Sequence, residues 1–213
     1  MIRQALSIRR GLMPQHKRRA MKTPAERKNT IYKVTGATGE MKPFVDLPVT
    51  ASPGNSNPFG LLGIYYDCSG RQLYASTVAG STQEKENGII FAVDAETGKI
   101  SDKITGKDAI ALCVCGITGE KRLYFGSGRS SDIFSVKLTK AGKFFGDIQK
   151  EISLDMLGPR SDDKARRIRF DKNGDMVVYA VEFNYNLTAP TEKQETLYRF
   201  RYADEEKKWD YIQ

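Results

Sequence analysis

The chain has 213 residues, of which 39% are apolar and 28% charged, an ordinary composition for a globular protein. Residues 1–28 contain nine Lys and Arg but one acid, whereas the remaining residues carry equal numbers of basic and acidic groups. The formal net charge of +8 therefore belongs to this first segment. Because phosphate binding requires a basic surface, we expect no nucleic-acid binding by the folded part.

Residues 1–28 leave three interpretations open. Their opening, MIRQALSIRRGL, resembles an organellar transit peptide. They could equally be a basic arm for an acidic partner or a membrane surface, or an extension without fixed structure. No secretory signal follows, and no apolar run reaches the ~18 residues that a transmembrane segment needs. We expect a soluble protein, with a cytoplasmic location favoured over organellar targeting.

A short pattern occurs four times along the chain. An apolar, an aromatic, a variable and an apolar residue lead into a polar turn, which is typical of two strands joined by a hairpin. The four copies are IYKVTGATGE (31–40), IFAVDAETGK (90–99), IFSVKLTKAGK (133–143) and LYRFRYADEEK (197–207).

Another pair of strands precedes each of the last three copies. These pairs occupy 61–76, 109–126 and 165–180, where apolar runs flank a glycine turn. Apolar residues two positions apart share one face of a strand, so each run should cover one core. In the last pair, Asn173 and Gly174 predict a tight type I′ hairpin.

Four antiparallel strands that recur every ~40 to 50 residues predict an all-β protein, a β-propeller of four-stranded blades. About three and a half blades are expected, a half blade at 29–48 and full blades at 59–104, 108–154 and 164–213. The chain would then either close as a small four-bladed ring or form the partial, C-terminal part of a larger propeller. A two-sheet sandwich is the alternative fold. An open arc would expose strand edges, which predicts self-association.

The residue types restrict the chemistry. The only histidine, His16, lies outside the repeats, which excludes Ser-His-Asp and Cys-His catalysis from them. A metal bound there would be a hard cation with oxygen ligands, such as Ca²⁺. Cys113 and Cys115 are expected to be buried free thiols, since their spacing fits neither a redox pair nor a zinc site.

Candidate ligand contacts are expected on one rim of the propeller. The loops between second and third strands and the connections between blades share this rim, where ligands commonly bind. The loop 181–195 supplies Glu182, Asn184 and Tyr185, and the adjacent blade supplies Arg129 and Asp132. Glu182 and Asn184 are the candidate ligands of a Ca²⁺ ion, because carboxylate and amide oxygens suit that ion.

Three arginines occur close together in an expected inner strand. Arg167 and its neighbours Arg166 and Arg169 would either line the central channel as an anion site or pair with nearby acids. The acids in question are Asp162, Asp163 and Asp171, and the pairing is the favoured alternative.

The segments 57–76, 90–100, 133–144 and 167–183 resemble the NHL-repeat and gluconolactonase-like (senescence-marker protein) six-bladed propellers, over roughly residues 29–213. Segment 88–100 is also similar to the repeat of pyrroloquinoline-quinone-type propellers. The gluconolactonase-like resemblance implies one divalent cation, usually calcium, held over the channel by carboxylates and amides, and hydrolysis of lactones or related esters. The ligand turn of that family, Pro-Asp-Gly, is replaced in the matching stretch by Arg166 and Arg167.

Two functions follow from the sequence. The first is a non-catalytic binding or scaffold propeller that uses its rim loops and central channel to bind a protein or a small polar ligand. The alternative is a divalent-metal-dependent lactonase or esterase, which the blade resemblance and the oxygen-rich loop 181–195 favour.

Overall fold

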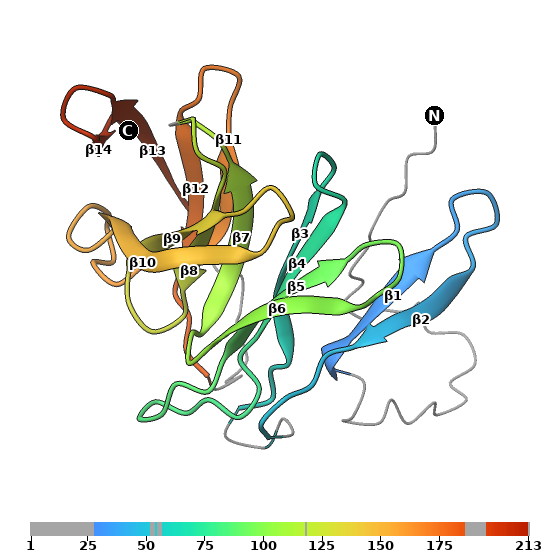
Figure 1. Ribbon diagram of the computed structural model, residues 1–213. Coiled ribbons are helices and arrows are strands. Elements are labelled where there is room, and N and C mark those ends of the chain that lie inside the picture. Colours follow the sequence, from blue (N-terminus) through green and yellow to red (C-terminus); the bar gives the residue numbers. More distant parts are fainter. Residues whose placement is uncertain (1–27, 52–53, 55–56, 118, 186–194, 213) are drawn as a thin grey trace.

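The computed structural model describes residues 28–51, 54, 57–117, 119–185 and 195–212, which contain fourteen strands and no α-helix (Figure 1). Strands β1 (Thr30–Val34) and β2 (Met41–Asp46) form a two-stranded sheet, called here the half blade. The first blade contains β3 (Leu61–Asp67), β4 (Gln72–Thr77), β5 (Ile89–Asp94) and β6 (Ile100–Thr105). The second blade contains β7 (Ala109–Cys115), β8 (Arg122–Ser127), β9 (Asp132–Leu138) and β10 (Phe144–Ser153). The third blade contains β11 (Lys164–Phe170), β12 (Met176–Val181), β13 (Thr196–Ala203) and β14 (Lys208–Tyr211).

Each blade is an antiparallel meander in which neighbours in sequence are neighbours in the sheet. The inner strands pack side by side, with β7 between β3 and β11, and the sheets fan out from them (Figure 1). The chain therefore folds as a β-propeller of three four-stranded blades and a half blade. This confirms the predicted fold class and not the two-sheet sandwich.

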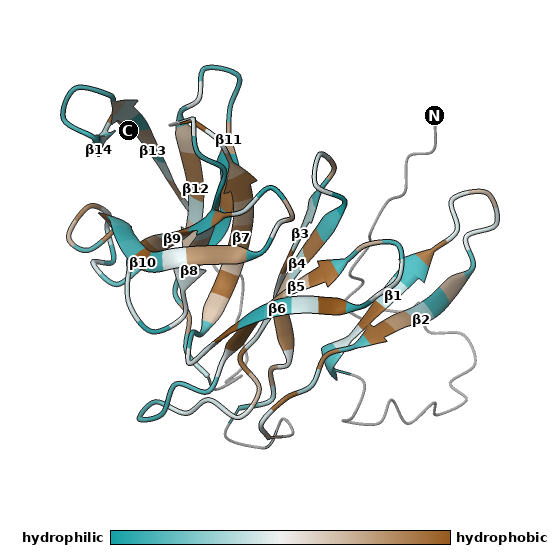
Figure 2. Cartoon of the chain, viewed as in Figure 1, coloured by the Kyte–Doolittle hydropathy of each residue, from teal (hydrophilic) through white to brown (hydrophobic). Residues whose placement is uncertain are grey.

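The apolar cores lie between successive sheets. One core joins the half blade to the first blade, a second joins the first blade to the second, and a third joins the second blade to the third. Figure 2 shows the pattern, with strand centres hydrophobic and most hairpin tips hydrophilic. Burial of one large apolar side chain contributes about 1.5–3 kcal/mol, so these layers are the main source of stability. Cys113 is buried in the third core, and its neighbour Cys115 packs against the same core.

Each inner strand contains a β-bulge near its start, at Leu62, Ile110 and Arg166. A bulge adds one residue to the strand, so residues on either side of it face the same core at a spacing of three instead of two. Ala109 and Leu112 illustrate this, since both belong to the core between the first and second blades. The three bulged residues lie outside the regular alternation of their strands. They contact one another where the inner strands pack side by side, as described below.

The turn between β11 and β12 differs from the predicted type I′ hairpin. That turn requires positive φ at both central residues, but only Gly174 adopts it, at +82°. The Gly174 N–H donates to the Asp171 carbonyl at 3.1 Å, and the Asp171 carboxylate accepts N–H bonds from Asn173 and Asp175. The prediction was wrong because the Asp171 side chain closes a longer turn and so removes the need for a left-handed Asn173.

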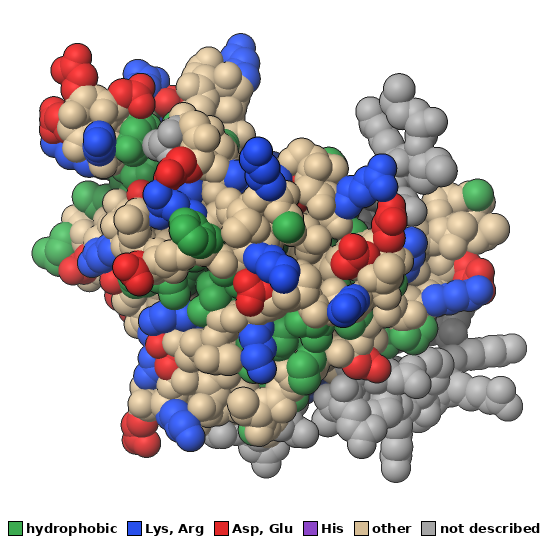
Figure 3. Space-filling model, viewed as in Figure 1, with side chains coloured by type: hydrophobic (Ala, Val, Ile, Leu, Met, Phe, Trp, Pro, Cys, Tyr) green, Lys and Arg blue, Asp and Glu red, His purple; other side chains and the backbone are tan. Residues whose placement is uncertain are grey.

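Basic and acidic side chains are interspersed over the face seen in Figure 3. Within the described ranges, no helix has the length and hydrophobicity that crossing a bilayer would require.

Candidate functional site

Loops from the three blades meet on one side of the propeller, called here the rim. In the first and second blades, the loop between the second and third strands is bonded to the connection that leads into the blade. Asn57, before the first blade, donates from Nδ2 to the carbonyl oxygens of Val78 and Ser81, both at 2.8 Å. In the second blade, the Gly128 N–H donates to the Asp108 carbonyl at 2.7 Å. The rim is thus fixed by polar contacts and not by apolar packing alone.

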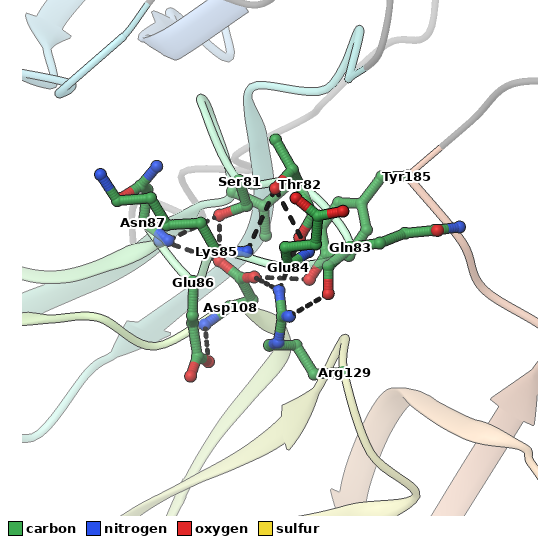
Figure 4. Close-up of polar contacts among 12 residues, drawn as sticks. Ser81, Thr82, Gln83, Glu84, Lys85, Glu86, Asn87, Asp108, Arg129 and Tyr185 are labelled. Carbon is green, nitrogen blue, oxygen red and sulfur yellow. Dashed lines mark hydrogen bonds and ion pairs between the residues drawn. The ribbon is translucent and has the colours of Figure 1, made fainter.

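Asp108, in the connection between the first and second blades, lies at the centre of the rim. Its buried carboxylate accepts hydrogen bonds from all three blades (Figure 4). The first blade supplies the Gly88 N–H at 2.8 Å and the Ser81 hydroxyl, the second blade supplies Arg129 Nη1 at 3.4 Å, and the third supplies the Tyr185 hydroxyl at 2.5 Å. Hydrogen bonds to an ionised acceptor in a low-dielectric site are strong, so one carboxylate fixes three loops.

Arg129 holds the β4–β5 loop (78–88) over this carboxylate. Its guanidinium donates to the carbonyl oxygens of Thr82, at 2.7 Å, and Gln83 (Figure 4). It also lies 5.8 Å from the ring centre of Tyr185. Burial alone would lower the pKa of Arg129, but Tyr185 and Asp108 raise it above its ordinary value. Burial and the bond to Asp108 raise the pKa of Tyr185 as well, so its hydroxyl stays a neutral donor.

A cavity of about 220 Å³, called here the rim cavity, opens beside this network, between the β4–β5 loop and the second blade. Its polar lining comprises Glu86, Lys107, Asp108, Ser127, Arg129 and Ser130, and its apolar lining comprises Phe125 and Phe134. Pockets for drug-sized ligands have about 300–1,000 Å³, so this space suits a smaller molecule.

The bulged residues fill the region between the three inner strands. Arg166 donates from Nη1 to the carbonyl oxygens of Ile110, at 2.9 Å, and Leu62, at 3.4 Å. On the rim side, the rings of Phe59 and Phe183 lie 5.4 Å apart and connect the first blade to the third. The Arg166 guanidinium therefore joins the three inner strands, and an aromatic contact lies on their rim side.

Asp163 is a second buried aspartate, in the connection leading into the third blade. It accepts hydrogen bonds from Arg160 Nε and from the Tyr198 hydroxyl, both at 2.7 Å. Burial alone would raise the pKa of Asp163, but the bonds from Arg160 and Tyr198 hold it below its ordinary range.

The structure brings together two of the predicted site residues, Arg129 and Tyr185, through Asp108. Asp132 lies beyond the rim cavity, where it accepts from the Ser130 hydroxyl at 3.0 Å and pairs with Lys150 at 2.8 Å. Burial would raise the pKa of Asp132, but the bonds from Lys150 and from nearby serines lower it.

Arg167 lies away from the rim cavity, where its guanidinium stacks 4.0 Å from the Tyr179 ring centre and pairs with Glu195 at 3.2 Å. The favoured pairing of the inner-strand arginines with nearby aspartates is wrong for two of those acids, since Asp163 pairs with Arg160 and Asp171 with Arg199. The physical reason is the bulge at Arg166. It reverses which face of β11 each following side chain lies on, so position in the sequence does not predict which acids are neighbours.

Glu182 and Asn184 are exposed on the loop that follows β12. They flank Phe183, which belongs to the aromatic contact between blades. The rest of the loop that was expected to supply ligands, 186–194, lies outside the described residues. Among the residues that the structure describes, no group of three His, Cys, Asp or Glu is placed to hold a metal ion.

Sequence reasoning missed Asp108 and Lys107, which form the base and one wall of the rim cavity. Both occur in a short polar connection, GKD (106–108), immediately before the inner strand β7. The corresponding position before β11 is also an aspartate, Asp163. This recurrence in the connections was the signal that could have found Asp108, whereas the position that matches Lys107 is Asp162 and gives no such signal.

Comparison with solved structures finds proteins with a similar chain path. Pseudomonas aeruginosa periplasmic gluconolactonase PpgL matches with a TM-score of 0.48 and 15% identity, over 83% of this chain and 47% of that protein. A candidate 6-phosphogluconolactonase from Bacteroides uniformis matches with a TM-score of 0.45 and 11% identity, over 86% of this chain and 62% of that one. Bacteroides ovatus GH43B, of a xyloglucan utilisation locus, matches with a TM-score of 0.44 and 15% identity, over 80% and 33%.

The chain spans less than two thirds of the length of each of these proteins. No protein-family model matches it, and the comparison with curated proteins gives no match. Similarities at this level carry no argument about activity, so the function has to be argued from the site.

Proposed function

We propose that this protein is a ligand-binding β-propeller that takes a small polar molecule in the rim cavity. The observation that carries the proposal is the position of the cavity, beside a buried carboxylate that ties loops from three blades together. Because the described residues that line the cavity are already held by bonds within the protein, a ligand would not have to order them, which lowers the free-energy cost of binding.

The contacts of the cavity favour binding over acid–base catalysis. A general base must have a free lone pair near the proton it removes. Both Asp108 oxygens accept hydrogen bonds from the protein, and Glu86 Oε1 accepts the Asp108 backbone N–H at 2.7 Å. Asp108, held in this way, fixes the shape of the site and is poorly placed to exchange protons with a substrate, while Glu86 Oε2 lies 3.9 Å from Lys107 Nζ.

Ligand-observed NMR tests the proposal with four classes of small molecule: neutral sugars, neutral amides, carboxylates and phosphate esters. A filled variant, Ser130→Tyr, places a ring in the cavity, and Thr50→Tyr adds the same ring at an exposed site outside it. We expect at least one class to bind the parent protein and Thr50→Tyr but not the filled variant. Binding by no class, or binding that the filled variant retains, would contradict the proposal.

A metal-dependent lactonase or esterase of the gluconolactonase-like class is the second candidate. The observation that favours it is the exposure of Glu182 and Asn184 on either side of Phe183, near the inner strands. A calorimetric Ca²⁺ titration of the parent protein and of Glu182→Ala and Asn184→Ala, together with a pH-stat assay of lactone hydrolysis, tests it. This candidate is supported if the protein hydrolyses lactones only with calcium and if each substitution abolishes calcium binding. It is dismissed if calcium does not bind, or binds with the same affinity in both variants as in the parent protein.

A further inference from the structure

The rim cavity contains hydrogen-bond donors that no described group of the protein uses. Both oxygens of Asp108 accept bonds from the protein, and Glu86 accepts a backbone N–H at Oε1. The other oxygen of Glu86, Oε2, has only a 3.9 Å ion pair with Lys107, so it is the one carboxylate oxygen of the cavity with which a ligand would compete.

Lys107 is the main donor without a hydrogen bond. Its Nζ makes none within the described part of the chain, and its ion pair with Glu86 Oε2 is long, at 3.9 Å. The ammonium group lies 6.0 Å from the ring centre of Phe134, on the wall of the cavity. Its side chain is 36% exposed, so it is partly shielded from water and can still be reached by a ligand.

Ser127 supplies a second donor, and it is 8% exposed. Its Oγ accepts the backbone N–H groups of Arg129, at 3.0 Å, and Ser130, at 3.1 Å. No described group accepts the proton of its own hydroxyl. A buried hydroxyl costs free energy when its donor is unused, so the site favours a ligand that brings an acceptor.

The other wall of the cavity is apolar. The rings of Phe125 and Phe134 stack 5.6 Å apart, and Phe134 is only partly buried. A planar or cyclic apolar body could lie against such a ring, as aromatic pairs do.

We propose that the rim cavity takes a small organic anion, whose carboxylate or phosphate group lies at Lys107 and Ser127 and whose ring lies against Phe134. This inference rests on the proposed function, because it names the ligand class of the same cavity. Charge-assisted hydrogen bonds from an ammonium group are about twice as strong as neutral ones, which makes Lys107 the determinant of the charge preference.

The test uses benzoate, phenyl phosphate and benzamide as probes of the full chain, measured by calorimetry at low ionic strength. Benzamide matches benzoate in shape but carries no charge. Lys107→Met removes the ammonium group and keeps most of the side-chain bulk. Lys103→Met is the matched control, since it changes the net charge equally at an exposed position outside the cavity.

We expect at least one anion to bind at least about tenfold more tightly than benzamide, and Lys107→Met to lose at least about tenfold of that affinity. The control Lys103→Met should bind as the parent does, and added salt should weaken binding of the anion more than of benzamide. If neither benzoate nor phenyl phosphate binds more tightly than benzamide, or if the affinity is unchanged in Lys107→Met, the anion preference is overturned and the proposed function stands. If none of these three probes and none of the four classes of small molecule named above binds in the cavity, both proposals fail.

Discussion

Removal of the Asp108 carboxylate should destabilise the whole rim. In Asp108→Ala, four groups lose their shared acceptor: the Gly88 N–H, the hydroxyls of Ser81 and Tyr185, and the guanidinium of Arg129. The Ser81 hydroxyl also accepts the Asn87 N–H, so its position would change as well.

The magnitude follows from these contacts. A buried donor left without an acceptor costs about 1–3 kcal/mol, and the Gly88 N–H and the hydroxyls of Ser81 and Tyr185 are three such donors. Arg129 is 24% exposed and can be hydrated in part, so the loss of its ion pair adds about 1 kcal/mol or less. Asp108→Ala should therefore lower the free energy of unfolding by at least about 3 kcal/mol, which is the lower end of the cost of removing one partner of a buried ion pair.

Urea unfolding followed by the fluorescence of the single tryptophan, Trp209, measures this change, since Trp209 is 8% exposed in a core between blades. Tyr185→Phe removes one of the four bonds and should cost about 1.5–3 kcal/mol. The exposed Asp155→Ala is the matched control and should stay within about 0.5 kcal/mol of the parent. If Asp108→Ala costs less than about 1 kcal/mol, the rim does not depend on this carboxylate.

Three further outcomes are expected. Arg166→Met removes two charge-assisted bonds between inner strands and should cost about 2–4 kcal/mol in urea unfolding, with faster hydrogen exchange of the inner strands; unchanged exchange would contradict this role. The lowered pKa of Asp163 means that its bond to Arg160 stabilises the protein fully above the ordinary aspartate pKa of about 3.9, and that this contribution is lost as the pH falls through the lower folded value. Asp163→Asn should therefore flatten the acid limb of a stability-against-pH curve, and an unaltered limb would refute the assignment. Burial raises the pKa of the Cys113 thiol to about 12, so a thiol reagent at mild alkaline pH should modify the exposed Cys68 rapidly and Cys113 only after unfolding. Rapid modification of Cys113 itself in the folded protein, located by fragmentation of the peptide that it shares with the partly buried Cys115, would show that the core opens.

The sequence determined the fold class because the repeated strand pattern is local. Each blade has an alternation of apolar residues and turns rich in glycine and polar residues, and these features specify strands and hairpins without distant contacts. The rim positions of Arg129 and Tyr185 were also predictable, since loop order along a blade fixes the side on which a loop lies. Their common contact with Asp108 was not, because it joins residues from three blades.

The tertiary structure alone decided the three bulges and the rim cavity. A bulge moves every following side chain to the opposite face, and nothing in the sequence of β11 (Lys164–Phe170) announces that Arg166 leaves the alternation and reaches two carbonyl oxygens on other blades. The same holds for the unused donors of Lys107 and Ser127, since whether a polar group has a partner depends on which loops pack against it. Local patterns are enough to form strands, but the chemistry of the rim arises only where three blades meet.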